Sequence, residues 1–235
     1  MSVSTPKITL YRGWLEPGRH VWSPFVIKLE ARLRFAGVPY ETKAGSVRTA
    51  PKGKIPYVEV SQSTVEGGDN ETAMTTQLGD STLIIKSLVE WGVLPDVNDG
   101  LDRGKRATDL AIRALLEEKL YFYHTRERWT QNYYSMRDHV LSALPYPLRI
   151  VVGNLIYRNI IKTLHGQGTG RYTDDEIRMF RKEIWETVND LLVSARAGDR
   201  AGDRRRPFWI LGGDTPRESD ATLFGFVVSV LVCTA

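Results

Sequence analysis

Two short segments of this chain carry residue types that could hold a small peptide by its backbone and its ends. The first is Lys54–Glu59, in which Pro56 stands at the mouth of an apolar strand. The second places an acid, Asp80, and a hydroxyl, Ser81, in front of an apolar helix. Free N–H groups at a helix start suit a carboxylate, and a nearby acid can pair with an amine. Together the segments predict a binding site.

Each of these features also has a purely structural explanation. A proline at this place is compatible with an edge strand, and an aspartate before a helix is an ordinary N-cap. Lys54 would be equally well placed as an exposed loop residue. The presence of both segments at this spacing favours the binding site.

Ser23 is the candidate catalytic residue. It precedes Pro24, a pair that is typical of a helix start. The chemistry in question is that of a thiol on the bound peptide. A free thiol has a pKa of about 8.5, so little of it is thiolate at neutral pH. A hydroxyl that donates to sulfur near a helix N-terminus would favour the reactive thiolate. The alternative is that Ser23 only caps the helix.

The elements that must position these residues follow from the apolar patterning. The first part of the chain predicts strands at 8–11, 38–42 and 55–60 and helices at 23–36 and 80–91. Residues 61–77 are polar and contain glycine, so they predict an insertion before a short edge strand. The α/β pattern ends near Pro95.

Beyond that point the apolar period is helical. It predicts helices at 110–129, 148–164, 173–195 and from 217 to the end, and Thr173 with Glu176 forms a capping box for the third. This change of period predicts an α/β domain over residues 1–95 and an all-α domain over 100–235.

Composition excludes several classes of function. The hydrophobic and charged fractions, 42% and 26%, are those of a globular protein. The net charge of +4 owes much to Arg196–Arg206, where interspersed Gly and Asp favour a solvated loop over a nucleic-acid site. The single cysteine, Cys233, allows no intrachain disulfide and no CxxC site. The four histidines are not at metal-ligand spacing, so no metal site is expected.

The chain also lacks an apolar leader, and its longest apolar stretch is too short to span a bilayer comfortably. We therefore expect a soluble, cytoplasmic protein with neither a membrane nor a nucleic acid as partner.

In the order of its elements the chain resembles the glutathione S-transferases over nearly its whole length. Ser23-Pro24-Phe25 resembles the serine-type enzymes, notably the plant tau class. Residues 23–30, 51–57, 79–84 and 115–121 are similar to the branch that contains the metaxins and the failed-axon-connections proteins. The resemblance implies a thioredoxin-like N-terminal domain, an all-helical C-terminal domain and a homodimer.

The resemblance also implies that glutathione is the cofactor. The bond before Pro56 would be cis, and the backbone of Ile55 would pair with the cysteinyl residue. Asp80 and Ser81 would hold the γ-glutamyl end, and Lys54 the glycine carboxylate. Asp80 stands where the family usually has Glu, one methylene longer, so this contact could be altered.

For catalysis, the resemblance assigns thiol activation to Ser23, with Tyr11 at the end of the first strand as the alternative. Tyr121, Trp129 and Tyr133 would line a pocket for an apolar electrophile, although aromatic residues at helical spacing are equally typical of a core.

Two reactions share this chemistry. One is conjugation, and the other is addition–elimination that isomerises a conjugated olefin, for example in the tailoring of a polyketide-type metabolite. A non-catalytic scaffold of the metaxin type is the alternative function.

Overall fold

The computed structural model describes residues 6–65, 71–198 and 207–233. The chain forms two compact units, of which the first combines Met1–Arg106 with Thr215–Val232 and the second contains Ala107–Asp214 and Cys233–Ala235. Residues 199–206, which hold most of the segment predicted to be a solvated basic loop, lie outside the described residues.

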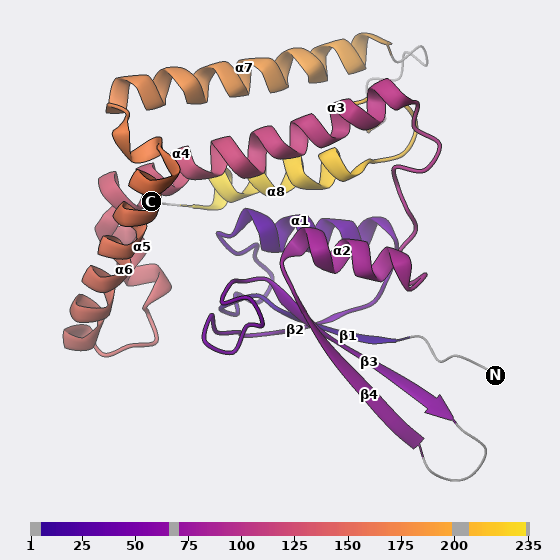
Figure 1. Ribbon diagram of the computed structural model, residues 1–235, viewed down its shortest axis with the longest axis horizontal. Coiled ribbons are helices and arrows are strands. Elements are labelled where there is room, and N and C mark those ends of the chain that lie inside the picture. The colour runs from indigo at the N-terminus through magenta and orange to yellow at the C-terminus, as the bar shows by residue number, and fades with distance from the viewer. Residues whose placement is uncertain (1–5, 66–70, 199–206, 234–235) are drawn as a thin grey trace. The chain divides into compact units, whose positions relative to one another are not determined.

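A four-stranded mixed sheet, in the order β2-β1-β3-β4, is the base of the first unit (Figure 1). Strand β1 (Lys7–Tyr11) pairs in parallel with β2 (Glu41–Lys43) and antiparallel with β3 (Tyr57–Val65), which pairs antiparallel with β4 (Glu71–Gly79). Helix α1 (Pro24–Phe35) connects the two parallel strands, and α2 (Ser81–Glu90) follows β4. The predicted thioredoxin-like architecture, followed by a helical region, is confirmed.

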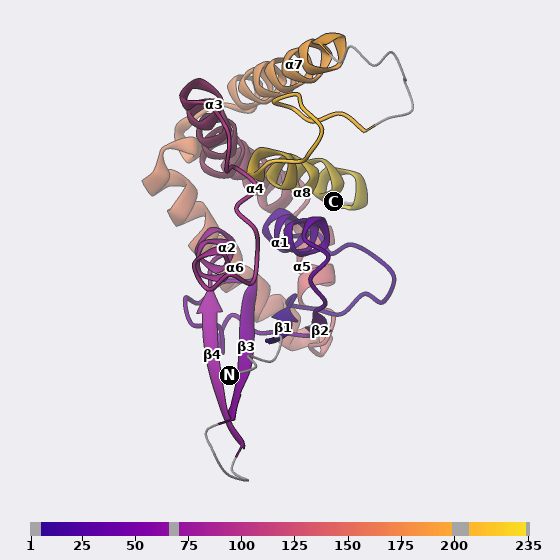
Figure 2. The same ribbon diagram turned by 90° about the vertical axis from the view of Figure 1, so that its right-hand side faces the viewer.

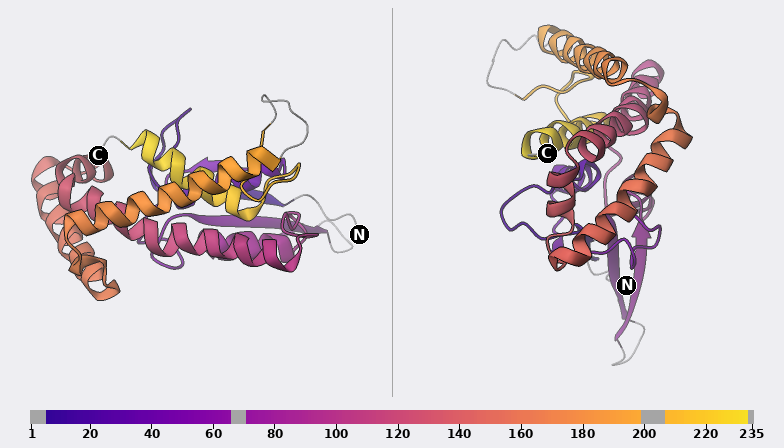
Figure 3. Two further views of the ribbon diagram at one scale, coloured as in Figure 1. Left: turned by 90° about the horizontal axis from the view of Figure 1, so that it is seen from above. Right: turned by 90° about the vertical axis from the view of Figure 1, so that its left-hand side faces the viewer.

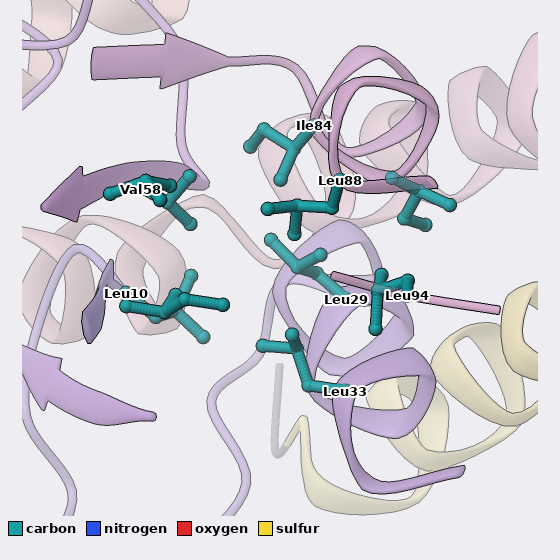
Figure 4. Packing of buried hydrophobic residues seen from close by; sticks show 10 residues of the cluster. Leu10, Leu29, Leu33, Val58, Ile84, Leu88 and Leu94 are labelled. Carbon is teal, nitrogen blue, oxygen red and sulfur yellow. The ribbon is translucent and has the colours of Figure 1, made fainter. Parts of the chain in front are cut away.

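The core of this unit lies between the sheet and its two helices. Because side chains alternate along a strand, β1 and β3 each turn every second residue toward α1 and α2. The buried cluster contains Ile8, Leu10, Val58 and Val60 from the strands, Leu29 and Leu33 from α1, Ile84, Ile85 and Leu88 from α2, and Leu94 (Figure 4). Both helices therefore pack on the same face of the sheet.

The prediction of a polar insertion over residues 61–77 is wrong. Strands β3 and β4 are each nine residues long and pair from Tyr57–Gly79 to Val65–Glu71. The segment is rich in serine and threonine, and threonine is a good strand former because its Cβ is branched. Ser61 and Thr75 also share a hydrogen bond of 3.0 Å across the pair. Polarity here indicated an exposed hairpin, not a loop.

The last helix, α8 (Glu218–Val232), belongs to the first unit and packs along α1 (Figure 2). Gly225 permits this approach, because a Cβ there would lie 2.4 Å from the carbonyl oxygen of Pro24. Ser229 Oγ donates to the carbonyl of Trp22 at 2.8 Å. The domain boundaries expected from the sequence stay a prediction, although these contacts group α8 with the α/β unit.

Enclosed by the sheet, α2 and α8, helix α1 buries three charged side chains. Lys28, Glu30 and Arg32 are each at most 2% exposed. Such burial is unfavourable unless each charge is paired or hydrogen-bonded. Lys28 Nζ donates to Thr82 Oγ1 at 2.9 Å, Glu30 lies 3.1 Å from Arg12 Nε, and Arg32 Nε lies 2.7 Å from Glu218 Oε1.

The second unit is helical. It contains most of α3 (Arg103–Ala114) together with α4 (Tyr121–Arg126), α5 (Tyr133–Val140), α6 (Tyr146–Gln167) and α7 (Asp174–Gly198). The helix predicted over 110–129 is interrupted by π-helical turns at Leu115–Leu120 and Glu127–Gln131. A 3₁₀ turn, Thr169–Arg171, joins the long helices α6 and α7, which run in clearly different directions (Figure 3).

The predicted capping box of α7 is present. The Thr173 N–H donates to Glu176 Oε2 at 2.7 Å, and the Glu176 N–H donates to Thr173 Oγ1 at 3.2 Å. Among the described helices, none is both long and apolar enough to cross a membrane.

We predict that Gly225→Ala destabilises the protein by about 1–3 kcal/mol, because the new methyl group would overpack the contact between α8 and α1. Gly166→Ala is the matched control. It lies in α6, and a Cβ there would meet no atom within 4 Å, so it should stabilise the helix by about 0.5–1 kcal/mol. Urea denaturation midpoints would compare the two, and equal effects would contradict the close helix contact.

Candidate functional site

The segments that the sequence analysis identified as candidate binding residues lie at one end of the sheet. The last residue of β1, Tyr11, stands opposite Tyr57, the first residue of β3, which stands opposite Gly79 at the end of β4. The Ile55–Pro56 segment, the Asp80–Ser81 pair and the loop that follows β1 therefore share this end.

Pro56 is buried, and the Ile55–Pro56 peptide bond is cis, as the resemblance implies. Ile55 is half-buried and precedes Tyr57, the first residue of the strand ladder. The loop after β1 passes close to it, because a Cβ on Gly13 would lie 2.9 Å from Ile55 Cδ1. Lys54 is exposed. The main chain of Ile55 thus lies just beyond the paired part of the sheet.

Asp80 caps helix α2, as the structural alternative proposed. Its Oδ1 accepts hydrogen bonds from the N–H groups of Thr82 at 3.0 Å and Leu83 at 3.2 Å. Asp80 is the one residue other than glycine with a positive φ, 78°, among the described residues. The N–H of Ser81 starts the helix and so has no acceptor within it, and Ser81 is 4% exposed.

Lys28 connects this helix start to α1. Its ammonium group, on a residue that is 1% exposed, donates to Thr82 in the first turn of α2. A buried cation therefore lies beside the N-terminus of α2, where the helix dipole already favours an anion. Lys28 could not be identified as a site residue from the sequence, because a lysine between apolar residues of an amphipathic helix is normally exposed to solvent.

Ser23 occupies the N-cap position of α1, with φ −82° and ψ 117°, but its hydroxyl makes no hydrogen bond to the first turn. Its carbonyl accepts from the Ile27 N–H at 3.2 Å. The residue is half-buried, and the bond from Ser229 to Trp22 fixes the chain just before it. The side-chain cap foreseen as the structural alternative is therefore not made.

Tyr11 lies in a different network. Its hydroxyl donates to Glu59 Oε2 at 2.7 Å, and its ring stacks on Tyr57 with a centroid separation of 4.3 Å. Gln77 donates to the other oxygen of Glu59 at 2.8 Å. The hydrogen bond to Glu59, together with partial burial, raises the pKa of Tyr11 to about 12. A phenol held in this way is poorly suited to stabilise a thiolate.

Glu59 and Gln77 were not foreseen as neighbours of Tyr11. Strand register brings them together, since Thr9 stands opposite Glu59 and Glu59 opposite Gln77. Side chains alternate between the two faces along a strand, so Tyr11, Glu59 and Gln77 lie on the same face of the sheet. This alternation is the sequence signal that could have identified Glu59 and Gln77 as neighbours of Tyr11.

The three aromatic residues predicted to line an electrophile pocket lie in the second unit. Trp129 is 8% exposed and belongs to the buried set. Tyr133 is half-buried, and its hydroxyl donates to Asn154 at 3.1 Å. Tyr121 is half-buried and packs edge-to-face on Phe122 at 5.4 Å. Their role in a pocket stays a prediction.

We predict that Glu59→Gln lowers the pKa of Tyr11 from about 12 toward its ordinary value of about 10, because the carboxylate acceptor is lost. A pKa raised in the folded state stabilises the fold fully below about pH 10, and this contribution is lost as pH rises through about 12. Ultraviolet titration of tyrosinate would measure it.

The chain has ten tyrosines, so each titration curve is compared with that of the same protein carrying Tyr11→Phe. A Tyr11 that titrates near pH 10 in the unchanged protein would contradict the hydrogen bond to Glu59.

Residues 24–136 match the family described as glutathione S-transferase N-terminal domain. Failed axon connections of Drosophila melanogaster is 25% identical over 230 residues, which cover 92% of this chain and 48% of that protein. The chain thus spans about half the length of this curated relative.

Two solved structures are similar at low identity. Glutathione transferase GSTFuA3 from Phanerochaete chrysosporium has a TM-score of 0.48 and 16% identity, with 97% of this chain and 86% of that chain covered. Maleylacetoacetate isomerase from Anaeromyxobacter dehalogenans has a TM-score of 0.44 and 19% identity, with 97% and 76% covered. Residues 24–136 therefore match the glutathione S-transferase N-terminal domain, and the thioredoxin-like sheet agrees with this match.

Proposed function

We propose that this protein is a glutathione-dependent transferase that activates the glutathione thiol at the end of the sheet where β1, β3 and β4 meet. One observation carries the proposal. The main chain of Ile55 lies beyond the ladder at the same end of the sheet as the Ser81 N–H, which has no acceptor within its helix, and the Ser23 hydroxyl makes no cap bond.

Glutathione would be held mainly by backbone groups and by the first turn of α2. The main chain of Ile55 would pair with its cysteinyl residue, and the N–H and hydroxyl of Ser81 would receive the γ-glutamyl carboxylate. The ammonium group of Lys28, which donates to Thr82 in the same turn, would stabilise this negative charge. Asp80 uses one carboxylate oxygen as the helix cap, so the other would pair with the γ-glutamyl amine. Lys54 would meet the glycine carboxylate.

Activation of the thiol would fall to Ser23. Its hydroxyl would donate to the sulfur, stabilise the thiolate and lower the pKa of the thiol. The thiolate then forms a carbon–sulfur bond with an apolar electrophile. In conjugation the new bond displaces a leaving group, or it opens a double bond whose other carbon takes up a proton, and the thioether is the product. In isomerisation the adduct of a conjugated olefin rotates about its new single bond and expels the thiolate, which returns glutathione unchanged.

A non-catalytic scaffold is the second candidate, and one observation favours it. The Asp80 side chain accepts hydrogen bonds from two of the N–H groups at the start of α2. Fewer N–H donors are therefore left for a ligand carboxylate than at an uncapped helix N-terminus. Glutathione binding separates the two functions, because a scaffold has no need of it.

We predict that Ser81→Ala weakens glutathione binding about tenfold or more, because a hydrogen bond to a charged group contributes about 1.5–3 kcal/mol. Ser87→Ala is the matched control, since Ser87 lies farther along the same helix, and it should leave the affinity unchanged. Calorimetry would measure both. If the unchanged protein shows no saturable binding at millimolar glutathione, the scaffold function replaces the enzyme.

We predict that Ser23→Ala lowers turnover with glutathione and an activated aryl chloride by about a hundredfold while affinity for glutathione stays similar, because the donor acts on the reacting sulfur. The fold should be retained, since the hydroxyl makes no cap bond. Tyr11→Phe is the control and should keep turnover, because that hydroxyl is bound to Glu59. Equal turnover of Ser23→Ala and the unchanged protein would refute the role of Ser23.

A further inference from the structure

Helix α6 has an unusual charge pattern. Its 22 residues, Tyr146–Gln167, include Arg149, Arg158 and Lys162 but no aspartate or glutamate. The neighbouring helix α7 mixes both signs along its length and joins them in surface ion pairs, namely Arg178–Asp175 at 2.9 Å and Lys182–Glu186 at 3.5 Å. A long helix that carries charge of one sign only is suited to a partner of the opposite sign.

One face of α6, its inner face, makes contacts within its own unit. Gly153 lies so close to α5 that a Cβ would be 2.7 Å from Arg137 Cγ. Tyr157 packs edge-to-face on Tyr133 with ring centroids 5.3 Å apart. Arg149 also turns inward, and its Nη2 donates to the carbonyls of Ser142 and Leu144. These contacts fix the rotation of α6 about its axis.

The opposite side of α6 presents one stripe of aliphatic and basic residues. Leu148, Val151 and Leu155 recur at helical spacing and are 48%, 57% and 61% exposed. The spacing continues to Arg158 and Lys162, both exposed, and neither has an acidic partner among the described residues. We call these five residues the outer stripe of α6.

Adjacent exposed aliphatic residues indicate an interaction surface. A second copy of the chain is a poor occupant, because α6 has no aspartate or glutamate, so a twofold contact along this stripe would cover Arg158 and Lys162 without an acidic partner from either stripe. An anionic lipid surface satisfies both halves of the stripe, since the aliphatic side chains can enter the acyl boundary while basic groups meet the headgroups.

We propose that the outer stripe of α6 binds the surface of an anionic bilayer, with the helix lying in the plane of the interface. This inference is independent of the proposed glutathione site. The expectation of no membrane partner rested on the lack of a spanning segment, which an interfacial helix does not need. Each basic side chain near such a surface contributes about 1 kcal/mol, a factor of about five in affinity.

The test is co-sedimentation of the full chain with vesicles of phosphatidylcholine alone or mixed with phosphatidylserine. The unchanged protein should bind the mixed vesicles, and salt should release it by screening. The double variant Arg158→Gln/Lys162→Gln should bind roughly 25-fold more weakly, at about fivefold per charge. Its matched control is Arg178→Gln/Lys182→Gln on α7, which removes two cations that are 72% and 74% exposed and should bind as before.

A second pair of variants tests the aliphatic half. Leu155→Ser should weaken binding to the mixed vesicles severalfold, whereas Met179→Ser, on α7 and 57% exposed, should not. Circular dichroism confirms that each variant is folded. Equal binding to both kinds of vesicle, no binding to either, or equal behaviour of the α6 and α7 variants would overturn the proposal. So would a dimer in solution that Leu155→Ser dissociates.

Discussion

The need to satisfy buried charge on helix α1 determines how the first unit is assembled. Lys28, Glu30 and Arg32 lie within five residues of one another and are almost completely buried. Each finds its partner on a different element: the first turn of α2, the loop after β1, and the start of α8. Arg32 also donates to the carbonyl of Pro95, beyond α2. Because an unpaired buried charge is costly, none of these elements can be moved independently of α1.

The same constraint ties the segments of the candidate site to the packed elements beneath them. Ser23 begins the helix that carries these charges, and α8 holds the residue before it through Ser229. Asp80 and Ser81 begin the helix that Lys28 reaches. Catalytic groups need support from packed neighbours if they are to keep their geometry. Here that support comes from the buried charged residues of α1. Tyr11, on the face of the sheet away from α1 and α2, is instead held by its hydrogen bond to Glu59.

Much of the first unit could be predicted from the sequence, because its strands and helices follow apolar periodicity and Pro56 and Asp80 mark where they begin. The polar composition of residues 61–77 led to a wrong prediction of an insertion, because the strands of an exposed hairpin can pair without apolar side chains. The network of Tyr11 depends on which residues face each other across strands, and a single sequence does not specify this register. The π-helical turns at Leu115–Leu120 and Glu127–Gln131 interrupt an otherwise regular apolar pattern and leave no local signal.

The place of α8 has a consequence for biosynthesis. The first unit is discontinuous, since Thr215–Val232 completes a body that otherwise ends at Arg106. A ribosome must therefore make all of Ala107–Asp214 before that body can close, a delay of roughly 5–20 s at ordinary elongation rates of about 5–20 residues per second. During this interval Arg32 lacks its carboxylate partner on α8. The nascent α/β body is thus expected to remain open, and to need protection, until Thr215–Val232 has emerged.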